Sequence, residues 1–168
     1  MAVKQSTQES IYDDKRYWYH VSNTLTRKQH KLIPWNNSQG MNRSDDEPDG
    51  KRICVAPSVA HCLTAVPYCL SEFYVVYRTK EPIKAHKAHG VFDAEITQEG
   101  WIKRPTVFVK IGTLDLDDVE IGEGISHVIK EAASKGKPSY SHKVLRWWLK
   151  INPEKYIKQP LTRKKKAV

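Results

Sequence analysis

The sequence lacks the features of a membrane protein or a secreted protein. Its apolar runs fall far short of the roughly 18 residues that a membrane-spanning helix needs. The first ten residues are polar and contain no hydrophobic signal region, so we expect a cytoplasmic protein without a membrane partner. Cysteine is also scarce. Cys54, Cys62 and Cys69 form an odd set in apolar surroundings, which argues against a disulfide framework and indicates reduced thiols.

Metal-ligand spacings are missing as well. Cys62 and Cys69 are seven residues apart, which is not the spacing of zinc ligands. His86 and His89 are closer together, but they lie in a polar connector that ends at Gly90, and no third ligand follows them. We therefore predict no metal site.

Acidic residues are nearly absent from the last 32 residues. Residues 137–168 hold 10 Lys or Arg against one acidic residue, Glu154, whereas residues 1–136 hold 18 residues of each sign. The whole net charge of +9 therefore belongs to the C-terminal segment. Such an excess predicts an acidic partner, with nucleic acid first and an acidic protein surface second. The alternative is a tail that only aids solubility.

The length of 168 residues and the ordinary apolar content predict one folded domain. Short apolar stretches between turn residues predict an α+β fold with split, mostly antiparallel β-sheets and short helices. By composition, the chain divides into a polar leader (1–14), an α+β core (15–124), basic C-terminal helices (125–158) and a basic tail (159–168).

Residues 52–66 predict the corner around which the chain is organised. Ile53 and Val55 favour a covered strand, Pro57 ends it, and Ser58 can cap a helix. The apolar face of that helix consists of Val59, Cys62, Leu63 and Val66. Corners of this kind often hold a ligand on outward-facing N–H groups, although a plain structural corner has the same pattern.

Alternating or continuous apolar residues predict further strands at 15–22, 72–79 and 106–111. In the first of them, His20 lies on the opposite face from Tyr19. The segment between this strand and the central corner has weaker signals. Residues 23–34 predict a short helix, and residues 35–50 predict a polar loop over the site.

The last third of the sequence predicts two helices. Gly136 is placed to end the first helix, and Ser141 is placed to cap the second. The second helix carries a basic stripe beside a tryptophan, which suits contact with a nucleic-acid backbone and bases. The alternative is a solvated face above a packed tryptophan. The candidate nucleic-acid contacts, including two in the tail, are Lys143, Arg146, Trp147, Lys150, Arg163 and Lys164.

The order of three short motifs resembles the small ADP-ribosyltransferase fold. These motifs are Tyr19-His20-Val21-Ser22, then Ile53-Cys54-Val55-Ala56-Pro57-Ser58 before a helix, then Phe73-Tyr74-Val75-Val76-Tyr77. The layout is similar to that of the compact enzymes that modify rifamycin antibiotics and of uncharacterised bacterial and phage proteins. The resemblance covers roughly residues 15–120 and leaves out the basic C-terminal part.

The resemblance implies NAD as a substrate and assigns roles to single residues. His20 would hold the ribose of NAD, and Glu99, with Asp93 behind it, would supply the catalytic carboxylate. Cys54 stands near the position where the family usually has a tyrosine that packs on the nicotinamide, and Tyr68 and Tyr74 are the candidate substitutes. The residues that the resemblance implies for the cofactor site are Tyr19, His20, Ser22, Ala56, Ser58 and Tyr74.

Three functions remain open at this point. The favoured one is an NAD-dependent mono-ADP-ribosyltransferase acting on a macromolecule or a small acceptor. A fixed carboxylate would stabilise the positive charge that develops on the ribose as the nicotinamide leaves. The second is a non-catalytic binding protein of the same fold. The third is a nucleic-acid-binding protein that uses the basic C-terminal helix and tail.

Overall fold

The computed structural model describes residues 16–24, 27–36, 50–66, 73–116, 119–133 and 139–159. The predicted leader, most of the predicted 35–50 loop and the tail from residue 160 onward lie outside the described residues. The same is true of Tyr68, of Cys69 and of two candidate nucleic-acid contacts, Arg163 and Lys164.

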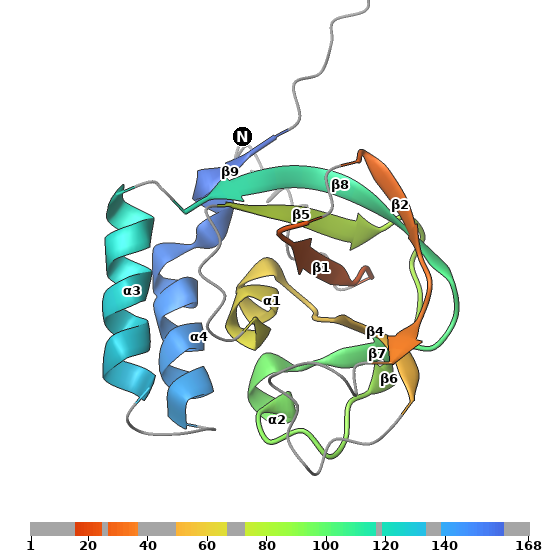
Figure 1. Ribbon diagram of the computed structural model, residues 1–168, viewed down its shortest axis with the longest axis horizontal. Coiled ribbons are helices and arrows are strands. Elements are labelled where there is room, and N and C mark those ends of the chain that lie inside the picture. The colour runs from red at the N-terminus through yellow and green to blue at the C-terminus, as the bar shows by residue number, and fades with distance from the viewer. Residues whose placement is uncertain are drawn as a thin grey trace, which may run out of the picture.

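The described chain has an α+β fold with two antiparallel sheets and four α-helices, which confirms the predicted class (Figure 1). The larger sheet has the strand order β1-β5-β8-β2, and β9 also pairs with β8. Its strands are β1 (Tyr19–Ser22), β2 (Gln29–Leu32), β5 (Phe73–Thr79), β8 (Thr106–Asp115) and β9 (Ile157–Lys158). The smaller sheet has the order β3-β4-β7-β6, with β3 (Trp35–Asn36), β4 (Lys51–Val55), β6 (His86–Lys87) and β7 (Gly100–Ile102).

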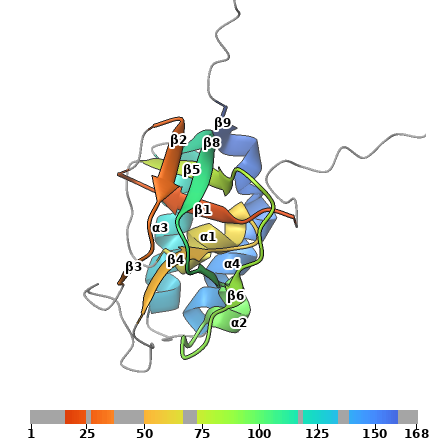
Figure 2. The ribbon, with the colours of Figure 1, turned by 90° about the vertical axis from the view of Figure 1, so that its right-hand side faces the viewer.

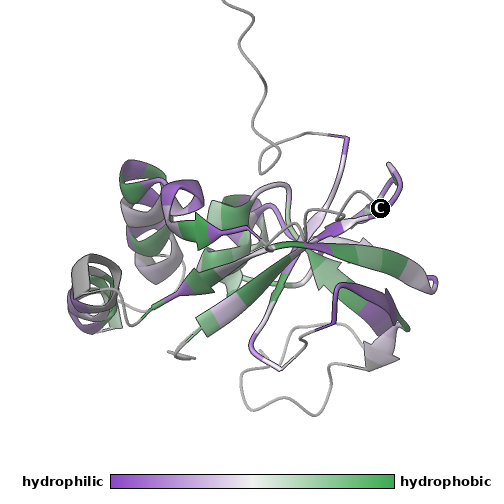
Figure 3. Cartoon of the chain, turned by 90° about the horizontal axis from the view of Figure 1, so that it is seen from above, coloured by the Kyte–Doolittle hydropathy of each residue, from purple (hydrophilic) through white to green (hydrophobic). Residues whose placement is uncertain are grey.

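The helices lie mainly on one side of the molecule. Figure 1 shows α3 and α4 side by side, with α1 between them and the larger sheet. Seen from above, the helices carry both hydrophobic and hydrophilic residues, whereas the long central strands are mostly hydrophobic (Figure 3). The helices are α1 (Val59–Ala65), α2 (Ala94–Thr97), α3 (Val119–Ala133) and α4 (Ser139–Ile151), and a 3-10 helix, η2 (Pro153–Tyr156), follows α4.

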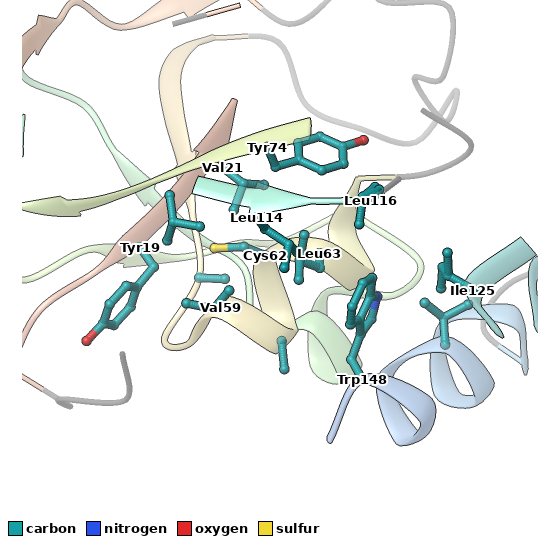
Figure 4. Packing of buried hydrophobic residues seen from close by; sticks show 14 of the residues in the cluster. Tyr19, Val21, Val59, Cys62, Leu63, Tyr74, Leu114, Leu116, Ile125 and Trp148 are labelled. Atoms are coloured by element: carbon teal, nitrogen blue, oxygen red, sulfur yellow. The ribbon is translucent and has the colours of Figure 1, made fainter. Parts of the chain in front are cut away.

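The first hydrophobic core fills the space between the larger sheet and the helices (Figure 4). Tyr19 from β1, Leu63 from α1, Ile125 from α3 and Trp148 from α4 all belong to it. The C-terminal helices therefore complete the core that the strands begin. The predicted boundary between residues 124 and 125 falls inside α3.

The second core lies between the two sheets. Ile53, Val55 and Ile102 from the smaller sheet pack with Tyr77 and Phe108 from the larger sheet. Figure 2, which turns the molecule by 90°, shows the smaller sheet and α2 below the larger sheet.

One extra residue in β8 lets the same strand contribute to both cores. In the pairing with β5, Val76 faces Gly112 and Tyr77 faces Lys110, so Ile111 is the additional residue. A bulge of this kind reverses the alternation of side chains along the strand. Phe108 consequently lies in the core between the sheets, and Leu114 lies in the core beneath the helices.

The predicted strand-turn-helix corner is confirmed. β4 leads through Pro57 into α1, and the Ser58 side chain accepts a hydrogen bond of 3.4 Å from the His61 backbone N–H. Other boundaries differ from the prediction. β8 continues past Gly112 to Asp115, because it stays paired with β5 and also pairs with β9 there. Gly112 fits this strand because a Cβ at its position would overlap the Ile157 side chain.

Two helix predictions are wrong, and tertiary contacts explain both. Residues 29–32 form β2 instead of a helix, because pairing with β8 buries part of His30 and Leu32. Ser141 does not cap α4, which begins at Ser139. Instead it is fully buried and donates a hydrogen bond to Asp93.

Candidate functional site

The first-strand histidine lies at the junction of the two sheets. Tyr19 and Ala56 exchange backbone hydrogen bonds of 2.9 and 3.0 Å, which join β1 to the end of β4. One residue further on, the Nδ1 atom of His20 lies 3.0 Å from the carbonyl oxygen of Cys54. The first and second motifs of the sequence are therefore in direct contact.

This hydrogen bond fixes the tautomer of His20. A carbonyl oxygen only accepts, so Nδ1 carries the proton and Nε2 holds a lone pair in the neutral ring. Burial lowers the pKa of His20 below its ordinary value of 6.5, and the hydrogen bond to Cys54 opposes that shift more weakly. The ring is thus neutral at pH 7, with a hydrogen-bond acceptor at Nε2.

Four side chains near His20 share the face of the smaller sheet that is turned away from the core between the sheets. The His20 ring itself lies on the core side, with its centre 5.9 Å from that of Phe108. Trp35 pairs with Arg52, and Cys54 pairs with Trp101, so these four side chains lie on the same face. The His20 ring meets the edge of the Trp35 ring at a centroid distance of 6.3 Å. We call these five residues the junction site.

The side chains of the junction site differ in their exposure to solvent. The Trp35 side chain is 41% exposed, and His20 is partly exposed. Arg52 is 3% exposed, and its guanidinium carbon lies 4.3 Å from the centre of the Trp101 ring. The cation and the Trp101 indole are therefore buried, whereas the Trp35 indole is open to solvent.

Glu99 contacts Trp101 of the junction site. The indole Nε1–H of Trp101 donates a hydrogen bond of 2.7 Å to its carboxylate. Burial raises the pKa of the Cys54 thiol to about 12, the Glu99 carboxylate adds to the rise, and the Arg52 guanidinium opposes it. Cys54 therefore connects the two predicted catalytic residues, with its carbonyl against His20 and its thiol near Glu99.

The other predicted catalytic residue, Asp93, has a structural position. Its side chain is buried, and it accepts a hydrogen bond of 2.7 Å from Ser141 at the start of α4. It precedes α2 and ties that short helix to α4. These contacts are enough to explain a buried carboxylate at this position, and a catalytic role for Asp93 remains a prediction.

The predicted cofactor residues separate into two groups. Tyr19 and Tyr74 are buried in the core beneath the helices, on the face of the larger sheet opposite His20. Ser22 lies on the His20 face and bonds to Thr24 at 3.3 Å. Ala56 contributes its backbone to the junction. Ser58 caps α1, and its hydroxyl lies 2.7 Å from Nδ1 of His61.

In the basic stripe on α4, fewer charged side chains are available to a ligand than the sequence spacing indicates. Lys143 forms an ion pair with Glu131 of α3. Trp147 packs over α3, where a Cβ at Gly124 would lie 2.6 Å from its ring, and against Trp148 with ring centres 4.8 Å apart. Arg146 and Lys150 remain exposed. Contact between this stripe and nucleic acid remains a prediction.

Three residues of the site were not singled out from the sequence: Trp35, Arg52 and Trp101. Trp101 had a usable signal, because it stands two residues after Glu99 in an extended stretch and so shares its face. The sequence gives no such signal for Trp35, because this residue stands at the edge of a polar segment. It lies beside His20 only because β3 pairs with β4 in the folded protein.

Comparisons with protein families, with curated proteins and with solved structures find no match to this chain. In the described part of the chain, no helix combines the length and apolar character that crossing a bilayer requires. Within the same residues, His, Cys, Asp and Glu side chains do not gather in threes as they would around a metal ion.

Proposed function

We propose that this protein is an NAD-dependent mono-ADP-ribosyltransferase whose catalytic residues are His20 and Glu99. The observation that carries the proposal is the hydrogen bond between His20 and the Cys54 carbonyl, because it brings the histidine motif against the strand that leads into the Ala-Pro-Ser turn. The split pair of antiparallel sheets supports the same family resemblance.

His20 would position the ribose of NAD. Its Nε2 lone pair can accept a hydrogen bond from a ribose hydroxyl, since Nδ1 is engaged by Cys54. The pKa of His20 is lowered by burial, which keeps this acceptor unprotonated near pH 7. Holding the sugar in the reactive orientation can by itself lower the activation free energy by several kcal/mol.

Trp35 would supply the aromatic ring that the second motif lacks. Cys54 stands where the resemblance expects a tyrosine, and its side chain is held among Arg52, Glu99 and Trp101. Trp35 lies beside His20 with its ring partly open to solvent, so a flat nicotinamide or adenine ring can stack on it.

Glu99 would act on the charge that develops at the sugar. The bond between ribose C1′ and the nicotinamide nitrogen breaks, its electron pair leaves with neutral nicotinamide, and positive charge remains on the ribose. A fixed carboxylate stabilises that charge more than it stabilises the ground state. A nucleophilic atom of the acceptor then bonds to C1′, and its proton passes to Glu99 or to water.

The test is titration of the full chain with NAD by calorimetry, followed by measurement of nicotinamide release with and without an acceptor extract. We expect NAD binding, with nicotinamide release lost in His20→Ala and in Glu99→Gln. His127→Ala on α3 and Glu95→Gln on α2 are matched controls, since both side chains are exposed and remain outside the junction site.

Two outcomes would overturn the proposal. Failure to bind NAD would show that NAD is not the substrate. Full turnover in both site variants would show that His20 and Glu99 are not the catalytic residues. NAD binding without nicotinamide release under any condition would instead support a non-catalytic binding protein of the same architecture.

A further inference from the structure

Although residues 1–136 are neutral as a whole, their basic and acidic side chains are unevenly distributed along the chain. In the described residues between 16 and 116, 13 Lys or Arg stand against five acidic residues, Glu81, Asp93, Glu95, Glu99 and Asp115. The acidic residues that balance the first 136 positions lie mainly in α3 and in segments outside the described residues. The strands of the two sheets themselves hold seven Lys or Arg and one acidic residue, Asp115.

Strand pairing gathers part of this charge on one face of the larger sheet. Lys31 of β2 pairs with Val107 of β8, and the Lys80 backbone N–H donates a 2.8 Å hydrogen bond to the Val107 carbonyl. The pairing of β5 with β8 thus extends to Lys80, and directly paired residues share a face. Two exposed lysines consequently flank Val107, one on each side, about 10 Å apart across two strand spacings.

The next row of the same face adds an arginine. Arg78 pairs with Val109, which pairs with Gln29. The Arg78 guanidinium carbon lies 4.1 Å from the centre of the Tyr17 ring, and that of Arg16 lies 5.7 Å from the same ring. Stacking on tyrosine holds the Arg78 side chain over the sheet rather than letting it extend freely into solvent.

This face is turned away from both the junction site and the core between the sheets. Tyr77 and Phe108, which alternate with Arg78 and Val109, point into the core between the sheets. The half-buried Val107 and Val109 form an apolar floor between the basic side chains. Glu81 follows Lys80 directly, and Asp13 and Asp14 precede Arg16 in the sequence but lie outside the described residues. We call Arg16, Lys31, Arg78 and Lys80 the basic sheet face.

We infer that the basic sheet face binds the phosphate backbone of a nucleic acid. Arginines held against Tyr17 and exposed lysines beside Val107 suit a row of phosphates, which they contact without reading sequence. An acidic protein would offer carboxylates at irregular spacing, whereas a nucleic acid offers a regular line of charge along the strand. This function stands whether or not the chain transfers ADP-ribose, because it uses neither His20 nor Glu99.

The experiment measures fluorescence anisotropy of a labelled single-stranded oligonucleotide of about 20 nucleotides, which exceeds the footprint of one small domain. The full chain is titrated at several salt concentrations between about 50 and 200 mM. The test variant is Lys31→Gln with Lys80→Gln. The control variant is Lys84→Gln with Lys87→Gln, which makes the same change in net charge at exposed positions next to and on the edge strand β6.

We expect the test variant to bind about tenfold more weakly and the control to bind like the unmodified chain. The slope of log affinity against log salt should fall by about 1.4 in the test variant, since each phosphate contact on a single strand contributes about 0.7. Circular dichroism of both variants checks that they fold alike.

Several results would overturn the inference. Equal weakening in the test and control variants would mean that only net charge matters. Weakening confined to a third variant, Arg163→Gln with Lys164→Gln, would assign binding to the tail. Tighter binding of a labelled polyglutamate of equal charge would identify an acidic protein as the partner, and an unmodified chain that binds no oligonucleotide would exclude the function altogether.

Discussion

The Nδ1 atom of His20 lies 3.0 Å from the carbonyl oxygen of Cys54, so a single side-chain hydrogen bond links the larger sheet to the smaller sheet. The adjacent backbone pair between Tyr19 and Ala56 holds the two strands in register at this point. The link also determines which ring nitrogen of His20 keeps a lone pair. Structure and proposed chemistry therefore depend on the same contact.

Acid should destabilise the protein partly through His20. Its pKa in the folded protein is lowered by burial, whereas the unfolded chain takes up a proton near the ordinary value of 6.5. Below that pH the unfolded state binds more protons, so the free energy of unfolding falls until folded His20 is protonated as well. The slope reaches at most about 1.4 kcal/mol per pH unit.

Urea unfolding at several pH values, compared between the unmodified chain and His20→Asn, checks this expectation. Asparagine keeps a donor for the Cys54 carbonyl but does not titrate. The difference in the free energy of unfolding between the two proteins should be constant above pH 6.5 and should change below it. His127→Asn, at an exposed position, should leave the pH profile unaltered; if it has the same effect, His20 is not the responsible group.

Ser141→Ala should cost about 1–3 kcal/mol of stability. Its hydroxyl is fully buried and donates to the buried carboxylate of Asp93, so truncation removes one partner of a charged acceptor. Denaturant unfolding gives the magnitude. His142→Ala, at the next and exposed position of α4, is the control and should change the stability by less than about 0.5 kcal/mol. Equal losses in the two variants would show that the effect belongs to the helix and not to this hydrogen bond.

Gly112→Ala should loosen the attachment of β9. A Cβ at this position would overlap the Ile157 side chain and lie 3.0 Å from the Lys158 carbonyl oxygen, so β9 must shift. Overpacking of this kind costs about 1–3 kcal/mol. Hydrogen exchange should show faster exchange at residues 157–158 and little change at the β1–β5 pair. Unaltered exchange at β9 would mean that the strand absorbs the extra methyl group.

The two described cysteines should react slowly with thiol reagents. Burial raises the pKa of Cys54 to about 12 and raises that of Cys62 well above its ordinary range, so little thiolate exists at pH 7.5. In a Cys69→Ser background, labelling by Ellman's reagent should be slow in buffer and fast in urea. Rapid labelling of either thiol in the folded protein would contradict the burial on which this expectation rests.

Much of the fold can be predicted from the sequence, because interactions between residues that are close together in the chain determine it. β-branched residues, Pro57 and Ser58 specify the strand-turn-helix corner through backbone geometry and capping alone. The alternation in β1 placed Tyr19 and His20 on opposite faces, as observed. The sequence predicts a helix at residues 29–32, because no feature of that segment indicates that it pairs with β8.

The sequence by itself determined the α+β class, the central corner and the face of β1 that carries His20, since each follows from interactions within a few residues. Only the tertiary structure decided that Trp35 lies beside His20 and that Asp93 is tied to Ser141. It also decided which charges gather on one sheet face. The contact between Asp93 and Ser141 joins residues 48 positions apart, and strand register and side-chain packing set these relationships rather than any spacing along the chain.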